Sequence, residues 1–242
     1  MPGLISLNLE RSRHLDRVKT FLQHCRPDVV CLQELSAGDV ATLQAASGLG
    51  HAHYVAMAVH PVDGRPFGVG ILSRTAFADT GFHTYGGTGD GSLLFDRTSP
   101  ESRLESCRYI AVQARLTVGG HDLRLATTHF PWTPDGNPAP FQWDCLHRLV
   151  EGLASGPLLL CGDFNAPRGG PIFAELAKHW RDHIPVDVTT SLDPLLHRAG
   201  PLELMVDGLF ASPHYRVEQV RLQAGVSDHQ AIVADVFEAG RA

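Results

Sequence analysis

Polar and charged side chains stand at or beside apolar, strand-like runs at six places along this chain of 242 residues. Those places hold Asn8 and Glu10, Gln33 and Glu34, Thr128 and His129, Asp163 and Asn165, Asp207, and Asp228 and His229. Burying charged groups without partners is costly, so packing alone does not explain the pattern. The placement therefore predicts a functional role for these side chains.

The carboxylates among them suit a metal site. Glu34 is a hard oxygen ligand of the kind that Mg²⁺ and Mn²⁺ prefer. A lone glutamate after a strand would more simply be an exposed turn residue, so the metal interpretation depends on the neighbouring motifs. Asn8 is uncharged and can both donate and accept hydrogen bonds.

Asp163 and Asn165 share one turn after the buried run Leu158–Cys161. A water that is to act as a nucleophile must be oriented and relieved of a proton, and Asp163 is the candidate for that task. Asn165 can donate to negative charge that develops in a transition state. The alternative is a structural turn, which Asp and Asn favour through local hydrogen bonds.

His229 follows Asp228 and precedes the last apolar run. Its imidazole could bind an anionic group of a substrate or protonate a leaving group. Asp207 interrupts an apolar run and is the natural partner to fix the tautomer of His229. A structural or solvated histidine is the alternative, because the chain has 14 histidines.

Hydrophobic periodicity indicates the elements that position these residues. Leu4–Leu9 is expected to be a buried strand, and helical spacing follows from Leu15 to Cys25. Pro27 ends that helix, and Val29–Leu32 is a second apolar strand. This β-α-β start favours a parallel pair of strands.

The rest of the chain is rich in strands. Gly119-Gly120 marks a hairpin, Phe141–Leu153 has helical spacing, and Tyr85–Arg103 reads as a long loop. Many strands with few helices suggest one domain, residues 1–242, with two sheets packed face to face and helices outside. The further strands are expected at His53–Val59, Phe67–Leu72, Tyr109–Val118, Leu123–Phe130, Leu158–Cys161, Leu204–Phe210, Val217–Leu222 and Ala231–Val236.

The composition and net charge indicate the class of substrate and the cellular compartment. The net charge is −6, without a basic stripe, which argues against tight binding of long DNA and favours a short or small substrate. The five cysteines form no CxxC motif and are expected to be reduced thiols in the cytoplasm. No secretory leader, membrane-spanning run or obligate protein partner is evident.

The segments SLNLE, CLQEL, TTHF, CGDFNAP, MVDGLF and VSDHQAI together resemble the motif set of the endonuclease/exonuclease/phosphatase superfamily. They occur in the family's order and extend from Ser6 to Ile232, which is nearly the whole chain. The resemblance implies a four-layered αββα sandwich with two mixed sheets. It also places the active site at one end of the two sheets.

The resemblance also implies roles for individual residues. Glu34 is the main ligand of Mg²⁺ or Mn²⁺, Asn8 lies near the metal and the phosphate, and Asp228 lies near the metal. His129 matches a position that contacts phosphate. Glu10 matches a second metal-linked carboxylate, although an ion pair with Arg11 or Arg13 is nearly as favoured.

The expected function is hydrolysis of a phosphate ester or phosphodiester by water with a divalent metal. The substrate is a phosphate ester and possibly a nucleic acid, so a nuclease and a small-molecule or lipid phosphoesterase remain rivals. An inactive binding module that retains the fold is the alternative. Trp132 could stack on a base or sugar, although packing over its loop is preferred, and Arg108 could meet a phosphate or be a surface charge.

Overall fold

The computed structural model describes residues 3–134 and 136–240. The helices are α1 (Leu15–Cys25), α2 (Val40–Ser47), α3 (Pro100–Ser106), α4 (Pro140–Leu153) and α5 (Pro171–His179), with a 3₁₀ turn at Ala37–Asp39. The strands are β1 (Gly3–Asn8), β2 (Val29–Ser36), β3 (His51–Val59), β4 (Pro66–Ser73), β5 (Phe77–Gly86), β6 (Tyr109–Val118), β7 (His121–His129), β8 (Leu159–Asp163), β9 (Arg181–Asp182), β10 (Asp207–Ala211), β11 (Tyr215–Gln223) and β12 (Ala231–Glu238).

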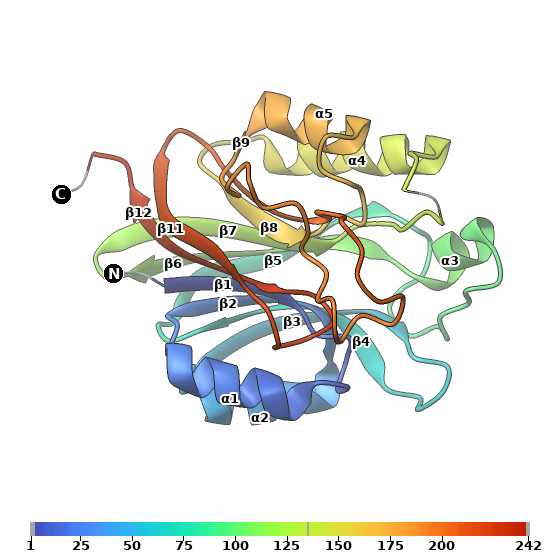
Figure 1. Cartoon of the computed structure of the whole chain (residues 1–242), viewed down its shortest axis with the longest axis horizontal. Coiled ribbons are helices and arrows are strands. Elements are labelled where there is room, and N and C mark those ends of the chain that lie inside the picture. Colours follow the sequence, from blue (N-terminus) through green and yellow to red (C-terminus); the bar gives the residue numbers. More distant parts are fainter. Residues whose placement is uncertain (1–2, 135, 241–242) are drawn as a thin grey trace.

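The strands form two six-stranded sheets. The first has the order β11-β12-β1-β2-β4-β3, and the second has the order β5-β6-β7-β8-β10-β9. Each sheet is mixed, because β1 pairs with β2 and β7 pairs with β8 in parallel, whereas the other neighbours are antiparallel. Helices α1 and α2 cover the outer face of the first sheet, and α4 and α5 cover that of the second (Figure 1). The expected four-layered αββα sandwich is confirmed.

In the first sheet, alternating side chains of one strand belong to two different cores. In β2, Val30 and Leu32 point outward and pack with Val18 and Leu22 of α1. Cys31, between them, belongs instead to the cluster that fills the space between the sheets. This period of two is the reason why a strand buried on both faces reads as a continuous apolar run.

The expected β-α-β start is present. Helix α1 ends at Cys25, ahead of Pro27, and Arg26 adopts a left-handed conformation that closes the last turn. The strands on either side of it pair in parallel. Gly119 and Gly120 have φ values of 57° and 83° and connect β6 to β7, which confirms the hairpin.

Several elements were not predicted from the sequence. Tyr85–Arg103 is not a single loop, because β5 extends to Gly86 and α3 begins at Pro100. Strand β5 lies at the edge of its sheet and leaves eight of its ten residues exposed or half-buried, so it has no apolar run. Helices α2 and α5 are short, and β9 has only two residues. The strand expected at Leu204–Phe210 begins only at Asp207.

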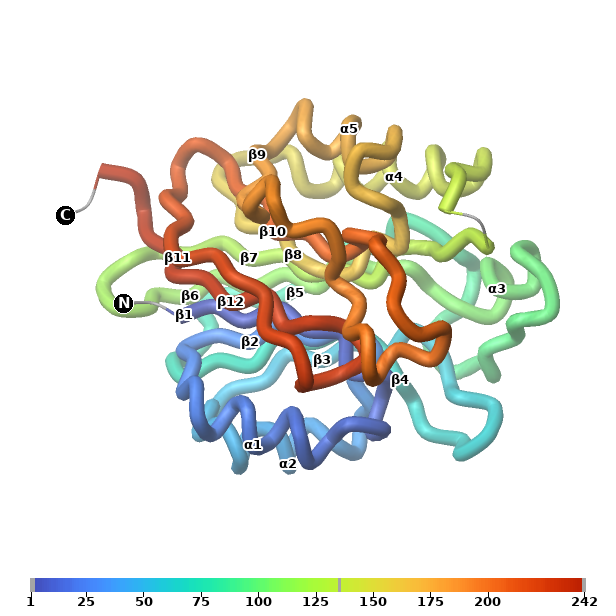
Figure 2. The backbone as a smooth tube through the Cα atoms, viewed as in Figure 1, coloured from blue at the N-terminus to red at the C-terminus, as the bar shows by residue number. Residues whose placement is uncertain are grey.

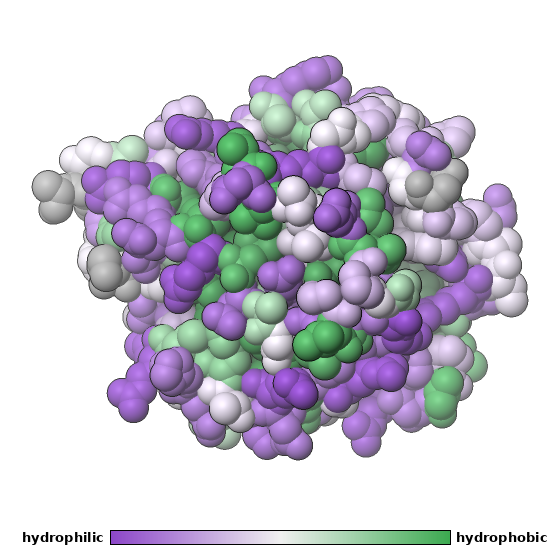
Figure 3. Space-filling view, viewed as in Figure 1, coloured by the Kyte–Doolittle hydropathy of each residue, from purple (hydrophilic) through white to green (hydrophobic). Residues whose placement is uncertain are grey.

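The surface and the cysteines fit the composition. On the face shown in Figure 3, hydrophobic side chains form small patches separated by hydrophilic ones. All five cysteines are free, and only Cys25 is not fully buried. No helix within the described ranges is long and apolar enough to cross a membrane.

Candidate functional site

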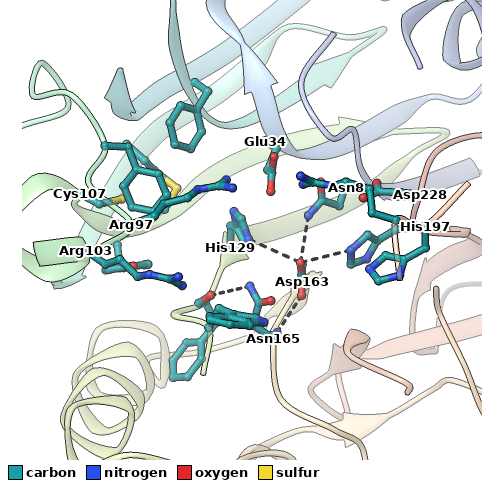
Figure 4. A pocket seen from close by; sticks show the side chains of 18 residues that line it. Asn8, Glu34, Arg97, Arg103, Cys107, His129, Asp163, Asn165, His197 and Asp228 are labelled. Atoms are coloured by element: carbon teal, nitrogen blue, oxygen red, sulfur yellow. Dashed lines mark hydrogen bonds and ion pairs between the residues drawn. The ribbon is translucent and has the colours of Figure 1, made fainter. Parts of the chain in front are cut away.

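A pocket of about 300 Å³ lies where side chains from the ends of both sheets converge (Figure 4). The structure brings most of the sequence-predicted residues together there. Seven of them line the pocket, namely Asn8, Glu34, His129, Asp163, Asn165, Asp228 and His229. Asp207 contacts His229 and Glu10 lies close to Asp228, but neither Asp207 nor Glu10 lines the pocket itself.

Strand register aligns the acidic and imidazole groups of the second sheet. His129 of β7 is the cross-strand partner of Asp163 of β8, and Asp163 is the partner of Asp207 of β10. Directly paired residues project their side chains on the same face of a sheet. The three side chains therefore form one row at the end of the sheet.

Three other side chains of the site lie close to the carboxylate of Asp163. Its Oδ2 accepts a hydrogen bond of 3.0 Å from Nδ2 of Asn8, which comes from the first sheet. The Nε2 atoms of His129 and His229 lie 3.6 and 3.8 Å from the same oxygen. Only 1% of the Asp163 side chain is exposed, so its charge is directed at these three groups.

Asp207 and His229 form a buried pair. Nδ1 of His229 lies 2.7 Å from Oδ2 of Asp207, and Oγ of Ser191 accepts a hydrogen bond from the Asp207 backbone N–H. Burial alone would lower the pKa of His229, but the carboxylates of Asp207 and Asp163 outweigh it and raise the pKa to about 10. His229 is therefore an imidazolium at neutral pH, able to donate from Nε2 to a phosphate oxygen or a leaving group.

Glu34 is aimed into the pocket by an irregularity in β2. The pairing of β2 with β4 shifts register between Leu32 and Leu35, and Glu34 has a φ of 49°. A bulge turns a side chain away from the regular alternation, and left-handed backbone is uncommon for glutamate. Its Oε2 lies 3.1 Å from Nη1 of Arg11, and 17% of the side chain is exposed.

Glu10 forms one of the two ion pairs expected for it, the pair with Arg13. It is buried, and its carboxylate faces Arg13 at 3.4 Å, His14 at 3.1 Å and Arg198 at 2.9 Å. The expected partner Arg11 binds Glu34 instead. Two arginines and His14 thus surround its oxygens, and Glu10 does not line the pocket itself.

The oxygen donors fit a divalent cation. Burial raises the pKa of Asp228, and the charges of Glu10 and Glu34 act in the same direction, whereas the charge of His229 opposes them. Donor atoms of Glu10, His14 and Asp228 lie within 4.8 Å of one another. Glu34, Asn8 and Asp228 line the same pocket and offer hard oxygen ligands suited to Mg²⁺ or Mn²⁺.

Asn165 combines the structural and the functional interpretation. Its backbone N–H donates to Oδ1 of Asp163 at 2.8 Å, as in an Asx-type turn, and its φ is 48°. Nδ2 donates to the carbonyl of Phe130 at 2.9 Å. A side-chain amide has two N–H bonds, so the second remains for a ligand in the pocket.

Three arginines and one histidine of the pocket were missed by sequence reasoning, namely Arg97, Arg103, Arg198 and His197. They come from irregular segments or a short helix, where no periodicity marks a functional position. Trp132 also lines the pocket, but the guanidinium of Arg103 covers one face of its ring at 4.5 Å. Arg108 donates to the carbonyl of Ala56 at 2.7 Å and does not line the pocket.

Comparisons with solved structures show the same fold in known proteins. The human Nocturnin catalytic domain with bound sulfate anion is 16% identical with a TM-score of 0.73, and the match covers 98% of this chain and 93% of that chain. A mannosyl-6-phosphatase from Bacteroides thetaiotaomicron is 16% identical with a TM-score of 0.67 over 98% and 99%. Truncated TDP2 from Caenorhabditis elegans is 17% identical with a TM-score of 0.61 over 98% and 97%.

Sequence comparison identifies the family. A search of curated proteins found no match. The model of the Endonuclease/Exonuclease/phosphatase family, however, matches residues 5–229, which include the six motifs up to His229. This chain therefore belongs to the endonuclease/exonuclease/phosphatase family.

Proposed function

We propose that this protein hydrolyses a phosphate ester or phosphodiester with water and a divalent cation, Mg²⁺ or Mn²⁺. Members of its family generally act on phosphate esters. The observation that carries the proposal is the meeting of Asn8 and Glu34 from one sheet with His129 and Asp163 from the other in a single pocket. The five free thiols agree with a reducing compartment, and a cytoplasmic location is part of the proposal.

Glu34, Asn8 and Asp228 would hold the cation. When bound, it would polarise the phosphoryl oxygen and stabilise charge on the leaving oxygen. The chain's own contribution is proton control and orientation. Asp163 is held between Asn8 and two imidazoles and would orient the attacking water and accept its proton.

His229 would stabilise negative charge on the phosphate group or on the leaving oxygen. Its Nε2–H would donate to a non-bridging oxygen or to the leaving oxygen, while Asp207 holds Nδ1–H in place. The free N–H of Asn165 and Nε2 of His129 would donate to the phosphoryl oxygens as negative charge develops there. No covalent enzyme intermediate is required.

A metal-dependence assay tests the proposal. The substrates are bis-p-nitrophenyl phosphate, p-nitrophenyl phosphate and a short oligonucleotide, each with excess EDTA and then with Mg²⁺ or Mn²⁺ restored. We expect no turnover in EDTA and recovery with the metals, because carboxylates so close together need a cation to offset their charge. Full turnover in EDTA would refute the mechanism. Metal and ligand binding without turnover on any substrate would favour an inactive binding module.

A further inference from the structure

Two arginines form one wall of the pocket and have no role in the proposed chemistry. Arg97 and Arg103 come from the segment between β5 and β6. In Figure 4 they lie across the pocket from Asp228 and His197, with Glu34 and His129 between the two sides, and Arg97 points toward Glu34. We call Arg97 and Arg103 the arginine pair.

No ion pair joins either arginine to a carboxylate in the described part of the chain, although Glu34 is the acidic group whose charge acts on Arg97. Each guanidinium lies over an aromatic ring instead, that of Arg97 at 5.4 Å from Phe95 and that of Arg103 at 4.5 Å from Trp132. Arg198, in the same pocket, differs because it pairs with a carboxylate. Stacking on a ring orients the plane of a guanidinium and leaves its N–H edge available for an anion.

The segment that carries the arginine pair is anchored to the rest of the fold. The backbone N–H of Phe95 donates to the carbonyl of Val59 at 2.8 Å, and that of Asp96 donates to Oγ of Ser106 at 2.9 Å. Ser99 caps α3 through the N–H of Ser102 at 3.0 Å. These bonds place both arginines before any ligand arrives, which reduces the entropy lost on binding.

We propose that the arginine pair binds a second anionic group, a phosphate or a carboxylate, on a small substrate whose ester phosphate lies at Asp163 and His229. This inference rests on the proposed function and specifies its substrate class. Guanidinium groups match the geometry of both anions. The pocket volume of about 300 Å³ suits a small molecule, and the net charge of −6 disfavours a long nucleic acid.

Binding of a matched pair of stable ligands tests the subsite without turnover. The ligands are 3-phosphonopropionate and propylphosphonate, which differ in the carboxylate, measured by calorimetry with Mg²⁺ present. We expect the wild type to bind 3-phosphonopropionate about tenfold more tightly. Arg97→Gln and Arg103→Gln should each reduce that preference. Arg148→Gln, on the exposed side of α4, is the charge-matched control and should retain it.

Hydrolysis of a matched pair of esters is the second test of the subsite. 3-Carboxyphenyl phosphate should have a higher kcat/KM than phenyl phosphate, and the arginine variants should lower this ratio. Arg97→Lys and Arg103→Lys keep the charge but lose the planar fork, so intermediate ratios are expected. If a glutamine variant has a lowered melting temperature, the test of the subsite rests on the lysine variants and on the kcat/KM ratio of the wild type for the two esters.

The outcomes separate the two proposals. Equal affinity of the wild type for both phosphonates would overturn the subsite, even if both esters are hydrolysed. A preference in binding without hydrolysis of any ester would sustain the subsite and contradict the proposed function. A kcat/KM that rises with the length of a single-stranded oligonucleotide, and loses this rise in the arginine variants, would assign the pair to neighbouring nucleic-acid phosphates and overturn the small-substrate proposal.

Discussion

Asp207→Asn isolates the contribution of a charge that does not itself line the pocket. Asp207 is 2% exposed, and its Oδ2 lies 2.7 Å from Nδ1 of His229. Asparagine has nearly the same shape but cannot carry the charge that stabilises the imidazolium. The substitution therefore leaves the packing intact and changes the protonation and orientation of His229.

The expected magnitude follows from this hydrogen bond. A pKa raised from 6.5 to about 10 corresponds to about 5 kcal/mol in favour of the imidazolium, shared between Asp207 and Asp163. A hydrogen bond to a charged group contributes about 1.5–3 kcal/mol, which is a factor of about 10 to 150 in rate. We expect kcat to fall by about 100-fold while the melting temperature changes by a few degrees at most.

The assay measures turnover and melting temperature on the same preparation. Asp182→Asn is the control, because Asp182 lies on β9, outside the pocket, and pairs there with Arg168. The double variant with His229→Ala should be no more than about threefold slower than His229→Ala alone, since residues that act as a unit are not additive. Fully multiplicative losses, or a fall in stability with normal turnover per folded molecule, would refute the pairing.

Three further outcomes are expected. Glu34→Gln should weaken Mg²⁺ and Mn²⁺ binding about tenfold or more, and Asp163→Asn should weaken it less; equal losses in a metal titration would contradict the division of roles. The folded-state pKa of His229 is about 10, above the unfolded value of 6.5. Its ion pairs therefore stabilise the fold fully below pH 6.5, and this stabilisation is lost as the pH rises through 10. In EDTA, the difference in melting temperature between the wild type and His229→Asn should shrink over that range, and a constant difference would speak against it. Gly162→Ala should cost at least about 3 kcal/mol in chemical denaturation, because φ is 146° and a Cβ would collide with the carbonyl of Thr128; a smaller loss would show that β8 can shift.

The strand-end residues could be predicted from the sequence because sheet geometry gathers them at one edge. Asn8 and Glu34 lie near the carboxyl ends of β1 and β2, which are parallel, and His129 and Asp163 end the parallel pair β7 and β8. Carboxyl ends of parallel strands meet at one edge. Asp207 begins β10, which is antiparallel to β8, so it arrives at the same edge. An apolar run followed by a polar residue is therefore a usable signal.

The arginine and histidine residues of the loops lack such a signal, since long-range contacts determine where they lie. The segment between β9 and β10, orange in Figure 2, is held beside the turn before β12 by the hydrogen bond from the Asp193 N–H to the Asp228 carbonyl. That bond brings His197 to the pocket, where its Nδ1 is buried without a partner among the described residues. The chemistry is thus encoded at strand ends, where local pattern suffices, whereas selection of the substrate depends on loops whose course follows only from the assembled fold.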